Sequence, residues 1–357
     1  MWLPAFISLF TSFVSLVLGY DEADLVFVGD AMQHAAQLDA AKTGSGYDYT
    51  GYFDSVENYI ALADFAVVNL ETPVGAPPHT GYPCFNAPPQ FVDALADAGF
   101  DLFLTANNHS LDRGPKGLRS TVSVLDSKGL LHIGTYSDDS SRVAALPLVM
   151  NVNNFKIAFL NYTYGTNGIT PRDGVVVDYI DRPLIKSDVE AARAAGAELV
   201  CVCIHWGDEY RLLPNATQRH LADFLEALGV DMIIGAHPHV IQPMELRPNK
   251  YYPDKNVLLV YSLGNFVSNM KTADTRGGAM ARVKLFRGDD RKPVVKSADY
   301  RLLFTLPAGA GAKNFRVVEP DSVPSAWKPR AIEFTRRARK IFDVNNINVP
   351  EAQPGLK

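Results

Sequence analysis

Five apolar runs in this sequence are each followed by side chains that can ligate a metal ion or transfer a proton. The runs span residues 25–28, 65–68, 102–105, 199–204 and 232–234. The polar residues after them are Asp30, Glu71, Asn108 with His109, His205, and His237 with His239. The runs resemble buried strands, and in open α/β sheets the ligand site lies beyond the carboxyl ends of the strands. The spacing therefore predicts one site assembled from five strand ends.

The chemistry of this set favours a transition-metal centre. Imidazole nitrogens combined with carboxylate oxygens suit Mn, Fe or Zn, whereas an oxygen-only set would favour Mg or Ca. Six or more ligands exceed the needs of a single tetrahedral zinc ion. We therefore expect two divalent metal ions, about 3.5–4 Å apart and bridged by a carboxylate. The fixed backbone of Pro238 would hold His237 and His239 rigidly at a strand end.

Each residue of the set also has a simpler interpretation on its own. Asp30 could cap a helix, Asn107 and Asn108 could form a turn, and His205 could be a hydrogen-bonded core histidine. The metal site is favoured because these alternatives would have to coincide at five strand ends. His34, four residues after Asp30, could also reach the site if a helical turn follows Asp30.

The elements that must position these residues alternate between strands and helices, which is typical of βαβ units around a parallel or mixed sheet. Helices are expected over residues 89–98, 114–128, 187–195 and 215–228, each followed by glycine. Two antiparallel pairs, residues 146–152 with 155–162 and 279–286 with 299–304, indicate that the sheet is mixed. We expect one domain over 24–318, because a split would divide the site. Residues 319–357 form a helical tail, in which 331–343 is interpreted as a solvated surface helix.

The composition excludes several classes of function. The chain has 357 residues with 34 basic and 39 acidic side chains, so its formal net charge is −5. No basic block is present that could neutralise phosphates, so a nucleic-acid partner is not expected. Cys201 and Cys203 lie two apart in an apolar run and are interpreted as buried thiols, so the three cysteines do not indicate a redox compartment.

The first 19 residues are almost continuously apolar and are followed by polar residues. A stretch of this length beside the start predicts a signal peptide or membrane anchor over 1–20, although no Lys or Arg precedes Lys42. We therefore expect an exported protein, periplasmic or at the cell surface. A segment that stays uncleaved would anchor it in the membrane. No later segment is long and apolar enough to span a membrane.

Taken together, these motifs resemble the CapA (PgsA-type) family of capsule and poly-γ-glutamate synthesis proteins, which belongs to the calcineurin-like metallophosphoesterase superfamily. The residues that carry the resemblance are Val28-Gly29-Asp30, Asn69-Leu70-Glu71, residues 106–112, His205-Trp206-Gly207, residues 235–243 and residues 261–266. The resemblance covers about residues 25–282. It implies a four-layer α/β/β/α sandwich of metallophosphoesterase type, with mixed sheets and a binuclear metal centre.

The resemblance also implies roles for individual residues. The metal ligands would be Asp30, Glu71, Asn108, His205, His237 and His239. His109 would protonate a leaving group, with Asp112 as its orienting partner. The superfamily places a ligand histidine at Met32, so either His34 replaces it or one metal position is weak. Glu71 stands where phosphoesterases carry Asp, which also departs from the pattern.

Substrate contacts are expected from residues beside the same motifs. They are Asn69, Tyr162, Tyr164 and Asn265. The two tyrosines, which together with Asn167 could line a substrate cleft, could equally be ordinary loop aromatics.

Two functions remain open from the sequence. The first is an exported metal-dependent hydrolase that acts on a phosphoester or amide linkage of a surface polymer. The second is a non-catalytic assembly or export factor, which binds an anionic polymer such as poly-γ-glutamate or capsule. Either function would place the protein near membrane-bound polymer synthesis machinery.

Overall fold

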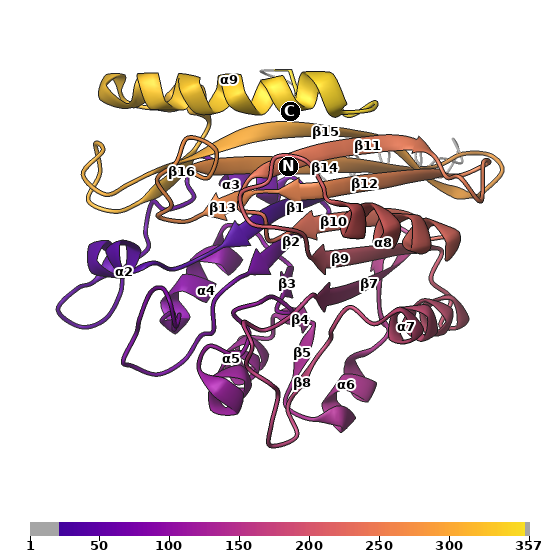
Figure 1. Cartoon of the computed structure of the whole chain (residues 1–357), viewed down its shortest axis with the longest axis horizontal. Coiled ribbons are helices and arrows are strands. Elements are labelled where there is room, and N and C mark those ends of the chain that lie inside the picture. Colours follow the sequence, from indigo (N-terminus) through magenta and orange to yellow (C-terminus); the bar gives the residue numbers. More distant parts are fainter. Residues whose placement is uncertain (1–20, 354–357) are drawn as a thin grey trace, which may run out of the picture.

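Two mixed sheets face each other in the structure, a computed structural model that describes residues 21–353 (Figure 1). The larger sheet has the strand order β16-β15-β14-β1-β2-β3-β4, and β13 pairs with β1. Its strands are β1 (Asp21–Ala31), β2 (Phe65–Leu70), β3 (Leu102–Leu104), β4 (Leu131–Ile133), β13 (Asn265–Val267), β14 (Gly277–Arg287), β15 (Pro293–Leu306) and β16 (Arg316–Val318). Strands β1 to β4 run parallel, whereas β14 to β16 are antiparallel additions, so the sheet is mixed.

The second sheet has the strand order β11-β12-β10-β9-β7-β6. Its strands are β6 (Leu148–Val152), β7 (Phe155–Thr163), β9 (Leu199–His205), β10 (Met232–Ala236), β11 (Ile241–Pro248) and β12 (Asn256–Leu263). A separate ribbon pairs β5 (Thr135–Tyr136) with β8 (Val176–Val177). The expected hairpin of β6 and β7 and the expected antiparallel pair of β14 and β15 are both confirmed.

Side chains that alternate along each strand face either the core between the two sheets or a core on the outer side of each sheet. Phe27 of β1 and Cys203 of β9 face the core between the two sheets. Val26 of β1 and Val202 of β9 face outward, each against the helices on its own side. This alternation follows from the two-residue repeat of a strand and leaves both faces of each sheet covered. The expected four-layer α/β/β/α sandwich is therefore confirmed.

Helices cover the outer faces of the sheets. They are α2 (Ala35–Ala41), α3 (Glu57–Ala61), α4 (Pro89–Asp97), α5 (Gly114–Ser127), α6 (Asp139–Ala145), α7 (Arg182–Ala194) and α8 (Ala216–Ala227). The expected ends of α4, α5 and α8 agree with the structure to within one residue. Helix α7 begins five residues earlier than expected, because Asp181 caps it by accepting a hydrogen bond from the Leu184 amide.

The C-terminal helix α9 (Lys328–Asn345) differs from its expectation. It lies along β15 and β11, one strand of each sheet, and is not a solvated surface helix (Figure 1). Ala331, Phe334, Ala338 and Phe342 are buried in the core between the sheets. These positions form one apolar stripe of the helix, which the many basic residues of the segment obscured in the sequence.

No helix within residues 21–353 is long and apolar enough to cross a membrane. The expected signal peptide or anchor over 1–20 lies outside the described residues.

Candidate metal centre

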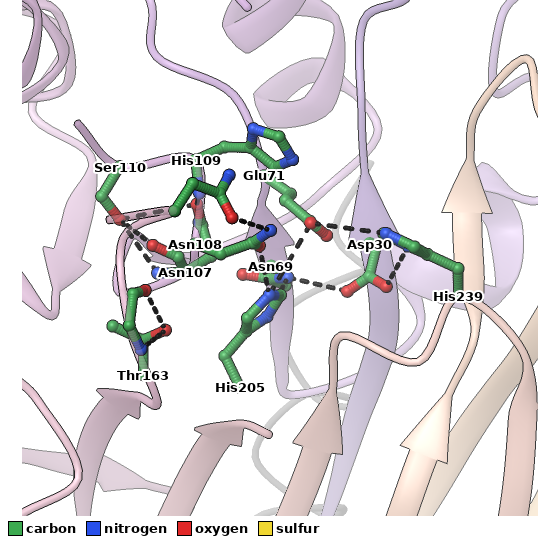
Figure 2. Close-up of polar contacts among 12 residues, drawn as sticks. Asp30, Asn69, Glu71, Asn107, Asn108, His109, Ser110, Thr163, His205 and His239 are labelled. Carbon is green, nitrogen blue, oxygen red and sulfur yellow. Dashed lines mark hydrogen bonds and ion pairs between the residues drawn. The ribbon is translucent and has the colours of Figure 1, made fainter. Parts of the chain in front are cut away.

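The predicted ligands gather where the carboxyl ends of the two sheets meet (Figure 2). Asp30 is next to the last residue of β1, and Glu71 follows β2 directly. His205 is the last residue of β9, and His237 follows β10 directly. One sheet therefore supplies the carboxylates and the other supplies the imidazoles, as expected for strand-end ligands.

The backbone at these strand ends is unusual in two places. His237 and His239 have φ angles of 100° and 57°, in the left-handed region that non-glycine residues seldom adopt. A Cβ atom at Gly29 would lie only 1.8 Å from the carbonyl oxygen of Gly264, so the chain beside Asp30 can approach β13 closely only because residue 29 is glycine. Both features set the directions of ligand side chains.

Five buried side chains form two overlapping groups of ligand atoms. One group is Glu71, His205 and His237, and the other is Asp30, Glu71 and His239. Within each group the ligand atoms all lie within 4.8 Å of one another. Glu71 belongs to both groups, and its Oε1 lies 3.7 Å from His205 Nε2 and 3.8 Å from His239 Nε2. A shared carboxylate is the arrangement that two neighbouring ions require.

Several polar atoms of this centre lack partners within the protein. Both carboxylate oxygens of Glu71 and Nδ1 of His237 are buried without a hydrogen bond among the residues described. A buried carboxylate without a partner costs several kcal/mol unless a cation or donor meets it. These orphaned atoms therefore fit divalent metal ions bound between the two sheets.

The protonation states agree with this role. Burial lowers the pKa of His237 to about 4 and the pKa of His205 well below its ordinary value. Both imidazoles are therefore neutral near pH 7, which is the form that ligates metals. Burial and the nearby charge of Asp30 raise the pKa of Glu71 well above its ordinary range. A bound cation would reverse this by stabilising the carboxylate.

Three asparagines lie against the ligands. Asn108 Oδ1 is 2.8 Å from His205 Nε2, so the sixth predicted ligand is brought to the centre. Asn69 donates from Nδ2 to Asp30 Oδ1 at 2.8 Å, and Asn265 Oδ1 lies 3.0 Å from His239 Nδ1. The contacts of Asn69 and Asn265 orient ligands, which is how outer partners tune metal sites.

His109 and Asp112 form the expected pair. His109 Nδ1 lies 2.8 Å from Asp112 Oδ2, and both side chains are buried. The Phe85 amide donates to the same oxygen at 2.8 Å, and the Phe85 ring packs edge-on against His109 at 4.7 Å. Because Nδ1 is held by Asp112, Nε2 is the nitrogen of His109 left to exchange a proton with a ligand.

His34 lies near the site, but it is not positioned by the helical turn after Asp30 that we expected. Strand β1 continues to Ala31, so no helical turn joins Asp30 to His34. His34 Nδ1 accepts a hydrogen bond from the Asn269 amide at 3.3 Å, and burial lowers the pKa of His34 to about 4. His34 belongs to neither ligand group of the described residues.

The two predicted tyrosines lie in different surroundings. Tyr162 lies in the outer core beneath α7 and donates its hydroxyl to Asp188 Oδ2 at 2.8 Å, so it is not brought to the site. Tyr164 is 48% exposed, and its ring lies 4.6 Å from that of His237. Tyr210, which the sequence reasoning missed, places its ring 6.2 Å from His239. The sequence feature that could have identified Tyr210 is its position five residues after His205, in the loop that follows this strand end.

Comparison with known proteins identifies relatives. A family model described as "Bacterial capsule synthesis protein PGA_cap" matches residues 24–270. The capsule biosynthesis protein CapA of Bacillus anthracis is 27% identical over 278 residues, which cover 74% of this chain and 64% of that protein. The PGA biosynthesis protein CapA of Bacillus subtilis (strain 168) is 28% identical over 276 residues, which cover 72% of this chain and 67% of that protein. The chain thus spans about two thirds of the length of these relatives.

Among solved structures, the NAD nucleotidase of Haemophilus influenzae superposes with a TM-score of 0.47 at 11% identity, covering 92% of this chain and 58% of that one. The family match includes both ligand groups and the pair of His109 and Asp112. The chain belongs to the bacterial capsule synthesis PGA_cap family, as its strand-end motifs predicted.

Proposed function

We propose that this chain acts in the synthesis of a capsule or poly-γ-glutamate-type surface polymer, through a hydrolase-type centre of two divalent ions, Mn, Fe or Zn. The observation that carries the proposal is the pair of buried ligand groups that share Glu71, whose oxygens form no hydrogen bond in the described part of the chain. The relatives named for capsule and PGA biosynthesis supply the biological context.

Bound divalent ions would supply Lewis-acid activation of a phosphoester or amide linkage and of the attacking water. Asp30, Glu71, His205, His237 and His239 would hold them, with Asn108 beside His205. In that hydrolysis the water oxygen would form a bond to phosphorus or to the carbonyl carbon, one proton of the water would be released to solvent, and the bond to the leaving oxygen or nitrogen would break.

His109 supplies the proton that the leaving group needs. Its Nε2 carries this proton when the imidazole is protonated, and the carboxylate of Asp112 stabilises the charged ring through Nδ1. The Phe85 ring holds the imidazole in place by its edge-on contact. The pair thus orients a general acid toward the ligand side of the centre.

The test uses the full chain loaded with Mn²⁺ and two chromogenic substrates, bis(p-nitrophenyl) phosphate and L-glutamyl-γ-p-nitroanilide. We expect metal-dependent turnover of one of them, reduced about 10²–10⁴-fold in His109→Ala with the metal content unchanged. The matched control is His132→Ala, because His132 also pairs with a carboxylate, Asp126, at 3.0 Å but on the edge strand β4. Turnover at the wild-type rate in His109→Ala would contradict the assignment of His109 as the general acid.

A non-catalytic assembly or export factor is the alternative, and the names of the relatives favour it because they specify biosynthesis rather than hydrolysis. In that case the same centre would bind an anionic polymer through its ions. A metal-loaded protein that turns over neither chromogenic substrate, yet binds poly-γ-glutamate only when metal is present, would establish this alternative.

Export belongs to the proposal as well. It is supported by the apolar residues 1–19, and it would bring the chain to the membrane-bound machinery that makes the polymer. Cell fractionation checks it: we expect the full chain in the periplasmic, surface or membrane fraction, and a cytoplasmic fraction holding nearly all of it would contradict export.

A further inference from the structure

Two arginine side chains stack on one tryptophan ring beside the start of α9. The guanidinium carbon of Arg276 lies 5.4 Å from the centre of the Trp327 ring, and that of Arg330 lies 4.9 Å from it. Arg276 directly precedes β14, whereas Trp327 directly precedes α9 and Arg330 lies in its first turn. Two segments that are distant in the sequence thus bring two positive charges to one ring. We call Arg276, Trp327 and Arg330 the tryptophan site.

The two guanidinium groups of this site have no carboxylate partner. Within the described part of the chain, neither Arg276 nor Arg330 belongs to an ion pair, and Arg276 donates from Nη2 to the Lys271 carbonyl oxygen at 2.9 Å. Asp274, the acid of the same loop, is held by Arg337 Nε at 2.6 Å and does not neutralise them. Burial and the charge of Arg330 lower the pKa of Arg276, as expected for two cations that repel each other.

Stacking on the indole leaves the hydrogen-bonding edges of the guanidinium groups available. A cation–π contact uses the flat face of a guanidinium group, whereas its five N–H donors point outward in the plane. This edge matches a carboxylate, which it binds through two parallel hydrogen bonds. Two such edges without an acid of the protein itself therefore suit a ligand that carries more than one carboxylate.

The neighbours of the tryptophan site add positive charge. Lys328 follows Trp327 directly, and Lys271 provides the carbonyl that holds Arg276. Both lysines are exposed, and neither belongs to an ion pair among the residues described. The whole chain, in contrast, has a net charge of −5. This locally positive surface would attract a polyanion that the rest of the molecule repels.

The loop that leads to Arg276 also borders the metal centre. Asn265, whose Oδ1 lies 3.0 Å from His239 Nδ1, donates from Nδ2 to the Thr275 carbonyl oxygen at 2.8 Å. Thr275 directly precedes Arg276. The loop thus contacts a residue that orients a metal ligand, and its end carries one of the two stacked arginines.

We propose that the tryptophan site is a second binding site, distinct from the metal ions, for an anionic polymer with repeated carboxylate groups. The inference rests on the proposed function for the identity of this polymer, because a poly-γ-glutamate-type chain carries a free carboxylate on each residue. It adds a place where the polymer is held without metal, which neither ligand group provides.

The test measures polymer binding in the absence of metal. The full chain in EDTA is titrated with poly-γ-glutamate and, separately, with the same polymer after its carboxylates have been converted to neutral amides. Titration calorimetry at low ionic strength gives the dissociation constants. We expect the carboxylate polymer to bind and the amide polymer not to bind, and the affinity of the carboxylate polymer should fall as salt is added.

Variants assign the binding to the stacked arginines. Arg330→Gln should raise the dissociation constant for poly-γ-glutamate at least about fivefold, and adding Arg276→Gln should raise it further. The matched control is the double variant Arg182→Gln and Arg219→Gln. These two arginines are also exposed and stacked, but each lies over a ring of its own, Phe224 or Tyr261. The control loses the same net charge and should stay within about twofold of the wild type.

Three results would overturn the inference. They are poly-γ-glutamate binding only when metal is present, equal losses in the control and in Arg330→Gln, and tighter binding to phosphatidylglycerol vesicles than to the polymer that is lost in Arg330→Gln. The last result would assign the site to a membrane surface.

The proposed function is tested separately from this site. If the wild type does not bind the polymer in EDTA but its Mn²⁺-loaded form turns over a chromogenic substrate, the proposed function stands and only the second site is lost. If the loaded protein turns over neither substrate and binds no polymer with or without metal, the proposed function and the inference fail together.

Discussion

Two buried polar clusters in this protein have opposite hydrogen-bonding states. In the arginine cluster, beneath α7, Arg142 donates from Nε to Asp178 Oδ1 at 2.5 Å and from Nη2 to Asp188 Oδ2 at 2.6 Å. The hydroxyl of Tyr162 donates to Asp188 as well, at 2.8 Å. In the metal centre, both oxygens of Glu71 lack a hydrogen bond among the described residues.

The two clusters differ in whether their buried polar atoms are hydrogen-bonded within the protein. Buried polar groups in folded proteins are almost always hydrogen-bonded, and a group left unpaired lowers stability. The arginine cluster meets this requirement with its own side chains, so it holds helices α6 and α7 to the fold. The metal centre does not meet this requirement at Glu71, so we expect bound cations to stabilise the protein there.

The largest effect is expected from breaking the complete cluster. Asp188→Ala leaves the Tyr162 hydroxyl without an acceptor and removes one of the two carboxylates that meet Arg142. We expect the free energy of unfolding to fall by about 3 kcal/mol, measured by urea denaturation, with metal content unchanged. Asp223→Ala is the control, since its pair with Lys250 is exposed and should contribute less than about 1 kcal/mol. Similar losses in both variants would contradict the special role of the buried pair.

Adding metal tests whether bound ions stabilise the metal centre. At a free Mn²⁺ concentration about ten times the dissociation constant of each site, each of the two ions should add about 1.4 kcal/mol, so the free energy of unfolding of the wild type should rise by about 2.8 kcal/mol. The variant Asp188→Ala should gain the same amount, because its lesion lies in the other cluster. Thermal denaturation with and without chelator measures both gains. If metal does not stabilise the wild type, the proposed difference between the two clusters is wrong.

A substitution at the shared carboxylate should stabilise the metal-free protein. Glu71→Gln keeps the shape and removes a carboxyl group that, without metal, must either be buried as a charge or take up a proton on folding, so the free energy of unfolding without metal should rise by about 1 kcal/mol. The expected change in free energy of unfolding is thus opposite in sign to that of Asp188→Ala, and this opposite sign distinguishes the two clusters most clearly. A destabilised Glu71→Gln protein without metal would show that Glu71 is already satisfied by groups of the chain.

The smallest effect concerns pH. The pKa of folded His34 is lowered to about 4, so between pH 6.5 and 4 the unfolded chain takes a proton that the folded protein does not. Stability should therefore fall as pH decreases, by about 1 kcal/mol from this residue between pH 7.5 and 5.5. His34→Gln should flatten the slope by that amount in denaturation at a series of pH values. An unchanged slope would place His34 in contact with solvent.

Local patterns in the sequence predicted βαβ units around a mixed sheet and candidate ligands at the strand ends, whereas the four-layer sandwich was implied by the family resemblance. Strand periodicity and strand-end position are readable one element at a time, and they brought Asp30 and His239 together across 209 residues. The same periodicity separates the buried Tyr162 from the face of its neighbour Asn161, whose side chain accepts the Ala106 amide. Applied at that point, it would have kept Tyr162 out of the predicted cleft.

Other features depend on contacts that no local pattern contains. His34 is placed by the extension of β1 to Ala31, where β1 pairs with β13 far along the chain. Tyr210 lies beside His239 because its amide donates to the Pro238 carbonyl at 2.9 Å, a contact that the spacing of residues alone does not indicate. Helix α9 was misjudged because its charges were weighed ahead of its apolar stripe.

The central claim is that two ions share Glu71, and metal stoichiometry tests it most directly. The full chain and its Glu71→Gln variant are loaded with Mn²⁺, desalted and measured by elemental analysis against protein concentration. The shared carboxylate predicts about two ions per wild-type chain and fewer than about one in the variant. A wild type that retains fewer than about one ion, or a variant that retains both, would contradict it.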